Sequence, residues 1–127
     1  MDETTTIAEL KEICRHYITE RDWQHDGLKD LTLAMSIEVG EILEHVRFKP
    51  EAEVREYLAD PANYREVAHE VADVFYFIMT ICLQLGLDLT TAYKEKMAIS
   101  EQRYPAHLAK GSNKKWTHYV GASEPDL

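Results

Sequence analysis

The stretch that decides the fold is residues 64–86, which read YREVAHEVADVFYFIMTICLQLG. Apolar side chains recur there at helical spacing, and the alternation typical of a strand is absent from the sequence. Gly86 is the residue type that ends helices in a left-handed conformation, so the pattern predicts a long helix over Tyr64–Leu85. Asp73 is the only charged residue in 71–87. Its apolar neighbours lead us to expect little access to water for this carboxylate.

Helical spacing also dominates the rest of the chain, and the boundaries follow from capping residues and prolines. Pro50 disfavours helix at the residue before it, and Asp88 is a typical N-cap. The predicted helices are residues 7–22 with Thr5 or Thr6 as N-cap, 29–47 beginning at Lys29 or Asp30, a short amphipathic piece over 50–59, 64–85 with Asn63 as N-cap after a turn at 60–63, and 89–103.

This outline predicts an all-α protein with a four-helix-bundle-like fold and one short extra helix. A length of 127 residues favours a single domain, and 45% hydrophobic residues suffice for a core. From Tyr104 onward the chain carries Pro105, Gly111 and several small polar residues, which indicates an irregular tail. We therefore expect a domain over residues 1–110 and an irregular C-terminal tail over 111–127.

Charge and cysteine usage narrow the class of protein. The net charge of −9 argues against binding to nucleic acid polymers, whereas single nucleotides remain open because a bound cation can invert a local charge. Cys14 and Cys82 fall in apolar helical patterns, which favours two reduced, buried thiols. The longest apolar run, 74–87, is short for a membrane span, and the acidic start does not resemble a signal peptide. We expect a cytoplasmic protein without membrane contact.

Two pairs of acids interrupt or border the apolar faces of consecutive predicted helices: Glu38 with Glu41, and Glu70 with Asp73. Residues three apart share one face of a helix, so the members of each pair point the same way. Carboxylates that converge between packed helices raise one another's pKa, and they either become protonated or bind a hard cation. Oxygen ligands without a nearby cysteine favour Mg²⁺ or Mn²⁺ over Zn²⁺. The pattern predicts a site for a metal-bound phosphate chain.

The residues around these acids resemble a known family. EVGEILEH at 38–45, followed by VAHEVADVFYFI at 67–78, is similar to the acid motif of the all-α nucleoside triphosphate pyrophosphohydrolases, the MazG-like superfamily. ERDWQ at 20–24 and KMAISEQRYPAHLAKGS at 96–112 resemble its dCTP pyrophosphatase branch. The resemblance covers residues 7–116. It implies a MazG-type fold and Mg²⁺-dependent hydrolysis of nucleoside triphosphates to the monophosphate and pyrophosphate.

The resemblance also implies roles for individual residues. One of the metal-site glutamates, with Glu41 as the candidate, would orient or deprotonate the attacking water, although the sequence does not settle which. Aromatic residues would hold the base, and basic residues would meet the phosphates. The implied metal ligands are Glu38, Glu41, Glu70 and Asp73, and the implied substrate contacts are Trp23, His25, Phe48, Phe77, Lys96 and Arg103.

Three positions depart from the branch. Phe48 stands where the branch can have tryptophan and Phe77 where it can have tyrosine, so both keep a ring while Phe77 lacks a hydroxyl. Ser100 replaces a common asparagine. The base preference is therefore open between dCTP or a modified dCTP, and dUTP or a broad range of nucleotides. Trp23 and Phe77 also fit plain core positions, and His25 a plain loop position.

Two other classes of protein are alternatives. Glu66 and His69 have the spacing of a di-iron ligand pair, but the second such pair that those bundles require does not occur on another long helix. A non-enzymatic helical oligomer or regulatory protein is the other alternative, and the presence of all four acids argues against it. Long apolar helices in a small chain, together with the family's habit, predict a homodimer or homotetramer in which a neighbouring subunit completes the base pocket.

Overall fold

The computed structural model describes residues 1–122 of the chain. Every regular element in that range is a helix, which confirms the predicted all-α class. The chain divides into two compact units, Met1–Leu87 and Asp88–Leu127, and each is described by itself. The predicted boundary at residues 110 and 111 stays a prediction.

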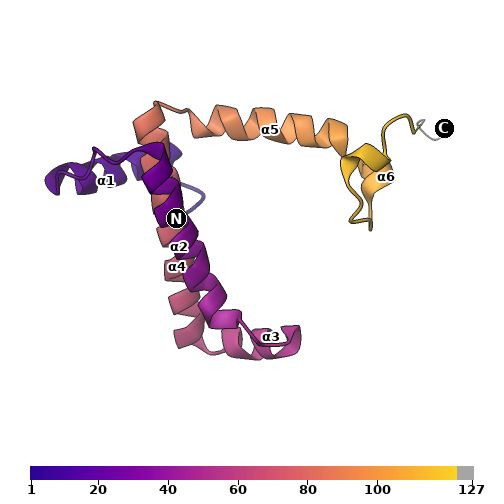
Figure 1. The fold of residues 1–127 in the computed structure, drawn as a ribbon, viewed down its shortest axis with the longest axis horizontal. Helices are drawn as coiled ribbons and strands as arrows, with labels where there is room; N and C mark the ends of the chain where they lie inside the picture. The colour runs from indigo at the N-terminus through magenta and orange to yellow at the C-terminus, as the bar shows by residue number, and fades with distance from the viewer. Residues whose placement is uncertain (123–127) are drawn as a thin grey trace. The chain divides into compact units, whose positions relative to one another are not determined.

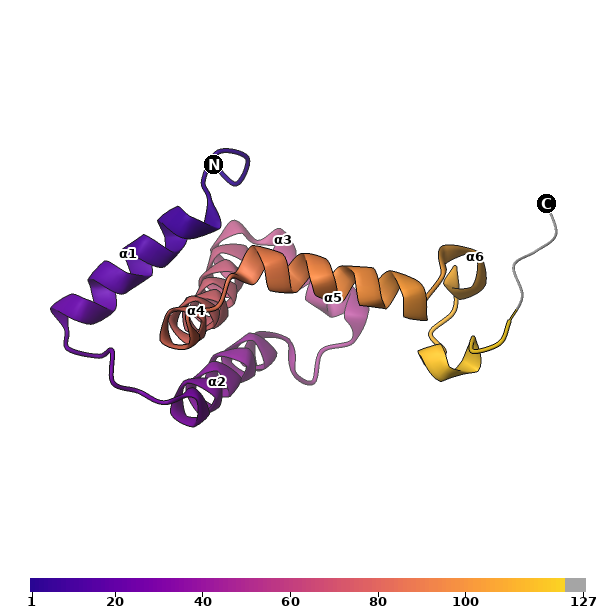
Figure 2. The same cartoon turned by 90° about the horizontal axis from the view of Figure 1, so that it is seen from above.

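The first unit contains four helices, α1 (Ile7–Glu20), α2 (Leu28–Val46), α3 (Glu51–Ala59) and α4 (Pro61–Leu85). Helix α4 is its centre, because it contacts the other three and packs most extensively on α2. Figure 1 shows α2 and α4 side by side along their length, and Figure 2 shows α1 and α2 both beside α4. The predicted stretch 64–86 therefore does organise the unit.

Capping residues fix the helix ends. Thr6 forms a reciprocal capping box with Glu9 at the start of α1, which confirms one of the two predicted N-caps. Gly86 ends α4 in the left-handed conformation, with φ of 62°, as predicted. The prediction of Asn63 as the N-cap of α4 was wrong. Asp60 accepts from the N–H of Ala62 instead, and proline at the first helical position extends the helix by one turn.

The interior of the first unit is small. Its buried apolar residues come from α1, α2 and α4, and the hydroxyl of Thr80 shares this interior with the thiol of Cys14 at 3.4 Å. Both cysteines are free and buried, which confirms the expectation of reduced core thiols. The buried apolar residues are Cys14, Ile18, Leu31, Met79 and Cys82.

The second unit contains α5 (Leu89–Arg103), capped by Asp88 as predicted, followed by α6 (Ala106–Ala109) and a 3-10 turn, η1 (Trp116–His118). The segment after Tyr104, expected to be irregular, contains these two short elements. The Arg103 guanidinium lies 4.9 Å from the centre of the Trp116 ring, and the Tyr104 and Tyr119 rings meet edge to face, so side-chain contacts organise the segment. Residues 123–127 of the predicted tail lie outside the described residues.

No single helix within residues 1–122 is long and apolar enough to cross a membrane, although α4 and α5 taken together as one broken pair satisfy the length and composition.

Candidate functional site

Three carboxylates meet between α2 and α4. Glu38 projects from α2, and Glu70 and Asp73 project from α4 at a spacing of three residues. One oxygen of each lies within 4.8 Å of the others. Helices α2 and α4 run antiparallel and pack side by side, so Glu70 and Asp73 on one face of α4 lie opposite Glu38 on α2. We call Glu38, Glu70 and Asp73 the acidic cluster.

The cluster raises the pKa of the Glu38 carboxyl above its ordinary value. Partial burial is the largest cause, followed by the negative charges of Asp73, Glu70 and Glu41 in that order. Both burial and like charges disfavour the ionised form of an acid. A cation at this position would relieve this repulsion, so the cluster is a place where positive charge is favoured.

Asp73 differs from the expectation drawn from its sequence neighbours. Its side chain was expected to have little access to water, and it is exposed in the single chain, whereas Glu38 and Glu70 are half-buried. The next residue, Val74, points to another face of α4, because successive helical positions are about 100° apart, whereas Tyr76 and Phe77 share the face of Asp73 and line a cavity with it. The cluster therefore opens to solvent on the Asp73 side, which leaves a path for a ligand.

Glu41 lies outside the acidic cluster. It is exposed one turn along α2 from Glu38, close enough for its charge to contribute to the raised pKa of Glu38. Of the four predicted metal ligands, the structure thus brings three together and leaves the fourth beside them. Whether Glu41 joins the metal shell or serves the attacking water stays a prediction.

The donor set suits Mg²⁺ or Mn²⁺. All three groups are carboxylates, and hard divalent cations prefer oxygen ligands. Opposite ligands of Mg²⁺ are about 4.2 Å apart when each Mg–O distance is about 2.1 Å. Oxygens within 4.8 Å of one another are therefore close to the required spacing. Three carboxylates leave other coordination positions for water and phosphate oxygens.

A cavity of about 560 Å³ adjoins the acidic cluster and shares Glu38 and Asp73 with it. Side chains from α1 and α4 form the remaining wall, and four of them are aromatic. The Tyr17 and Tyr76 rings pack edge to face at 5.8 Å, and the Tyr76 and Phe77 rings at 5.0 Å. Its other lining residues are Leu10, Ile13, Cys14, Ala72, Phe75 and Met79.

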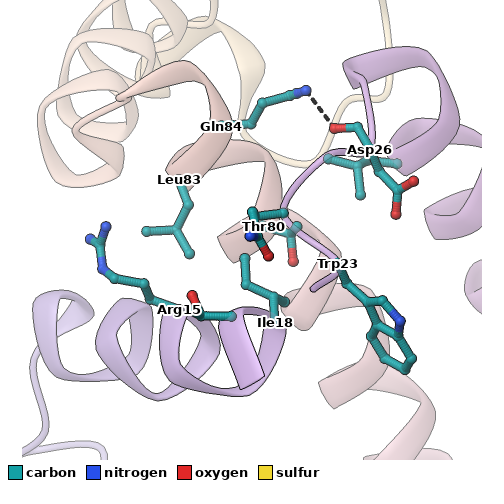
Figure 3. Close-up of a pocket in the computed structure, with 10 residues that line it drawn as sticks. Arg15, Ile18, Trp23, Asp26, Thr80, Leu83 and Gln84 are labelled. Atoms are coloured by element: carbon teal, nitrogen blue, oxygen red, sulfur yellow. Dashed lines mark hydrogen bonds between the residues drawn. The ribbon is translucent and has the colours of Figure 1, made fainter. Parts of the chain in front are cut away.

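A second, smaller cavity of about 270 Å³ lies between α1, the α1–α2 loop and α4. Trp23 lines this cavity, as Figure 3 shows, together with Arg15 and Thr80. The side-chain amide of Gln84 donates to the backbone carbonyl of Asp26 and ties the loop to α4. Trp23 contacts Tyr17, a lining residue of the first cavity, with the centres of the two rings 5.9 Å apart.

The other predicted substrate residues are dispersed. Phe77 lines the cavity beside the acidic cluster. His25 is exposed in the loop and contacts Asp22 at 3.1 Å. Phe48 is 96% exposed, at a left-handed φ of 61° directly after α2. Lys96 and Arg103 are carried by α5 in the second unit, and their contact with phosphates stays a prediction.

Sequence reasoning missed Tyr17, Tyr76 and Cys14 as lining residues of the cavity. Cys14 and Tyr17 on α1 have the apolar spacing of a core helix. That spacing is the same whether the Tyr17 ring packs against a neighbouring side chain or lines an open cavity. The adjacency of three aromatic residues in 75–77 was the available signal, because a single helical face cannot bury three consecutive rings.

Over residues 1–122 the fold and the site together define an all-helical protein with a cluster of three carboxylates beside an aromatic cavity. No family model matches the chain. The curated protein dCTP pyrophosphatase 1 of Mus musculus is 31% identical over 131 aligned positions, which cover 94% of this chain and 77% of the relative. The Homo sapiens protein of the same name is 32% identical over 113 residues, 88% of this chain and 66% of the relative.

The chain belongs to the dCTP pyrophosphatase family. This confirms the resemblance drawn from the acid motif and the segment at 96–112. The chain spans about two thirds of the length of the human relative and about three quarters of the mouse relative.

Proposed function

We propose that this protein hydrolyses nucleoside triphosphates, with dCTP or a base-modified dCTP as the preferred substrate, to the monophosphate and pyrophosphate in a Mg²⁺-dependent reaction. The observation that carries the proposal is that Glu38 and Asp73 line both the acidic cluster and the aromatic cavity. The same carboxylates belong to the acidic cluster and to the aromatic cavity, so a metal-bound phosphate chain and a base fit side by side. The relatives named dCTP pyrophosphatase 1 support the choice of nucleotide.

The residues of the cluster have a defined task in this scheme. Glu38, Glu70 and Asp73 hold the cation, which when bound neutralises phosphate oxygens and makes a coordinated water more acidic. Glu41 stands beside the cluster with its carboxylate exposed, where it accepts the proton of the attacking water. Glu41 is a suitable acceptor because it carries negative charge without being one of the three converging ligands.

The cavity holds the base by stacking and by shape. Its volume of about 560 Å³ lies within the range of about 300–1,000 Å³ common for small-molecule sites. Tyr17, Tyr76 and Phe77 offer ring faces and edges to a planar base. Glu38 and Asp73 form the charged end of the cavity, so the phosphate chain enters on that side and the base rests against α1.

A broader substrate range is favoured by one observation. Among the side chains that line the cavity, hydrogen-bonding groups other than the two cluster acids are limited to the Tyr17 and Tyr76 hydroxyls and the Cys14 thiol. Few polar groups give little discrimination between cytosine and uracil, since strong rejection requires a site group left unpaired by the wrong base. A dUTP-preferring or broad hydrolase that removes unwanted nucleotides is therefore the second candidate.

Both candidates are tested by one panel. The full-length protein is incubated with Mg²⁺ and dCTP, 5-methyl-dCTP, dUTP, dTTP, dATP or dGTP, and the nucleotide products are separated chromatographically. Preference for the two cytosine nucleotides supports the first candidate. Similar rates on all six, or a preference for dUTP, support the second. Failure to turn over any nucleotide would contradict both and favour a non-enzymatic role.

Self-association is part of the proposal. The first unit leaves large apolar side chains exposed on α1 and α2, including Ile13 at 66%, Ile37 at 63% and Leu43 at 58%. Exposed apolar surface of this extent on helices is typical of interaction sites, so a homodimer or homotetramer is expected. Sedimentation equilibrium would measure the mass, and a monomer at micromolar concentration would contradict this part of the proposal.

A further inference from the structure

Three side chains from three helices connect the acidic cluster to the short helix α3. The Nδ1 atom of His45 on α2 lies 2.8 Å from the hydroxyl of Tyr57 on α3. The Nε2 atom of the same ring lies 4.0 Å from Oε1 of Glu70 on α4. Only 16% of the His45 side-chain surface and 24% of that of Glu70 are exposed. The histidine therefore stands between a tyrosine and a member of the acidic cluster, largely shielded from water.

Tyr57 is held in place by contacts with side chains around it. The side-chain amide of Asn63 donates to the Tyr57 carbonyl at 3.1 Å. The Lys49 ammonium lies 4.8 Å from the centre of the Tyr57 ring and donates to the His45 carbonyl at 2.9 Å. These contacts fix α3 against the end of α2, so the position of the Tyr57 hydroxyl is set by the fold.

The charge of Glu70 bears on which nitrogen of a neutral His45 ring carries the proton. A neutral imidazole has one N–H and one lone pair, and a lone pair directed at a carboxylate would be repelled. In the neutral ring this repulsion favours the tautomer with its proton on Nε2, facing Glu70, and in that tautomer Nδ1 accepts from the Tyr57 hydroxyl. At 4.0 Å the Nε2 atom is beyond hydrogen-bonding distance of Oε1, and an approach of about 1 Å by either side chain would close the bond.

We propose that His45, oriented by Tyr57, is a positioning residue that directs its Nε2–H at Glu70 and so fixes the carboxylate for metal binding. The arrangement corresponds to the outer partners that orient the ligands of metal sites elsewhere. It makes α3 part of the site although α3 supplies no ligand to the cluster. The inference rests on the proposed function only in taking the acidic cluster as a cation site.

The test measures binding of Mn²⁺ to the full-length protein by electron paramagnetic resonance, without nucleotide. Loss of an outer partner typically weakens metal binding by about 10–100-fold. His45→Leu should therefore raise the Mn²⁺ dissociation constant by at least about tenfold. Tyr57→Phe, which removes one oxygen, should raise it less. The double variant should bind no more weakly than His45→Leu alone, because both changes interrupt the same chain of contacts.

A conservative variant separates positioning from packing. Glutamine at position 45 retains an N–H that can reach Glu70, so His45→Gln should recover most of the affinity lost in His45→Leu. The matched control is His16→Leu, because His16 is an exposed histidine on α1 that contacts Glu20 and not the acidic cluster. Its dissociation constant should equal that of the wild-type protein. Helicity by circular dichroism verifies that each variant is folded.

The outcomes distinguish this inference from the proposed function. Wild-type affinity for Mn²⁺ in His45→Leu would overturn the inference even if dCTP is hydrolysed. Equal loss in His45→Leu and His45→Gln would also overturn it, because the N–H would then be irrelevant. The predicted series of affinities in a protein that hydrolyses no nucleotide would support the inference and contradict the proposed function.

Discussion

Replacing Asp73 by asparagine should stabilise the metal-free protein and remove its response to Mg²⁺. Asp73→Asn keeps the size of the side chain and deletes one of the three negative charges in the acidic cluster. In the absence of metal those charges repel one another, so the fold gains when one is lost. In the presence of metal the same change removes a charged ligand. Asp73→Asn is thus expected to raise the stability of the metal-free protein and to remove the stabilisation that Mg²⁺ provides.

The size of the effect follows from the geometry. Two unit charges 4.8 Å apart repel by about 0.9 kcal/mol at the dielectric constant of water. Asp73 takes part in two of the three pairs, and salt at physiological strength reduces each by nearly half. Partial burial of Glu38 and Glu70 acts the other way, because it lowers the local dielectric constant. We expect about 1–2 kcal/mol of stabilisation, which corresponds to about 4–7 °C in melting temperature for a chain of this length.

The assay is thermal unfolding followed by circular dichroism, first with a chelator and then across a range of Mg²⁺ concentrations. Glu56→Gln is the matched control, because it removes one exposed acid from α3 outside the acidic cluster and changes the net charge equally. Metal-free Asp73→Asn should melt above this control, and Mg²⁺ should raise the melting temperature of the control but not of Asp73→Asn. Equal melting of the two metal-free variants, or an undiminished response of Asp73→Asn to Mg²⁺, would refute the reasoning.

Three further changes have distinct expected results. Glu41→Gln should abolish turnover while Mn²⁺ affinity stays within about threefold of wild type, since Glu41 lies outside the three converging ligands; a parallel loss of affinity would make Glu41 a ligand instead. Met79→Ala should cost about 2–5 kcal/mol in urea unfolding, because Met79 is 2% exposed, whereas Met97→Ala, 47% exposed on α5, should cost about 0.5 kcal/mol or less. The cap bonds from Thr6 lower the pKa of Glu9 from its ordinary 4.5. Glu9→Ala should therefore lower the melting temperature above pH 4.5, and this difference from wild type should vanish as the pH falls through the lowered pKa. A difference that does not depend on pH would contradict the capping argument.

The helices were predictable because their signals are local. Thr6, Gly86 and Asp88 act through contacts within a few residues, and apolar spacing identifies a helical face without knowledge of its partner. Asn63 failed as an N-cap for a similar local reason, since Asp60 followed by proline is a stronger start signal three residues earlier.

The acidic cluster was predictable in part, and the cavity was not. Spacing of three placed Glu70 and Asp73 on one face, and the chemistry of oxygen ligands suggested their use. The rotation of α2 against α4 decides that Glu38 converges with them while Glu41 does not, and that rotation depends on packing between helices. Contacts such as His45 with Tyr57 join residues that lie on separate helices, so no periodicity within one helix indicates them.

The central claim is that the acidic cluster supports cleavage of a nucleoside triphosphate between its α and β phosphorus atoms. Phosphorus-31 nuclear magnetic resonance of dCTP incubated with the protein and Mg²⁺ tests it most directly. We predict that the triphosphate signals are replaced by those of dCMP and pyrophosphate in equal amounts, and that a chelator stops the reaction. Accumulation of dCDP and inorganic phosphate, or an unchanged dCTP spectrum, would contradict the account.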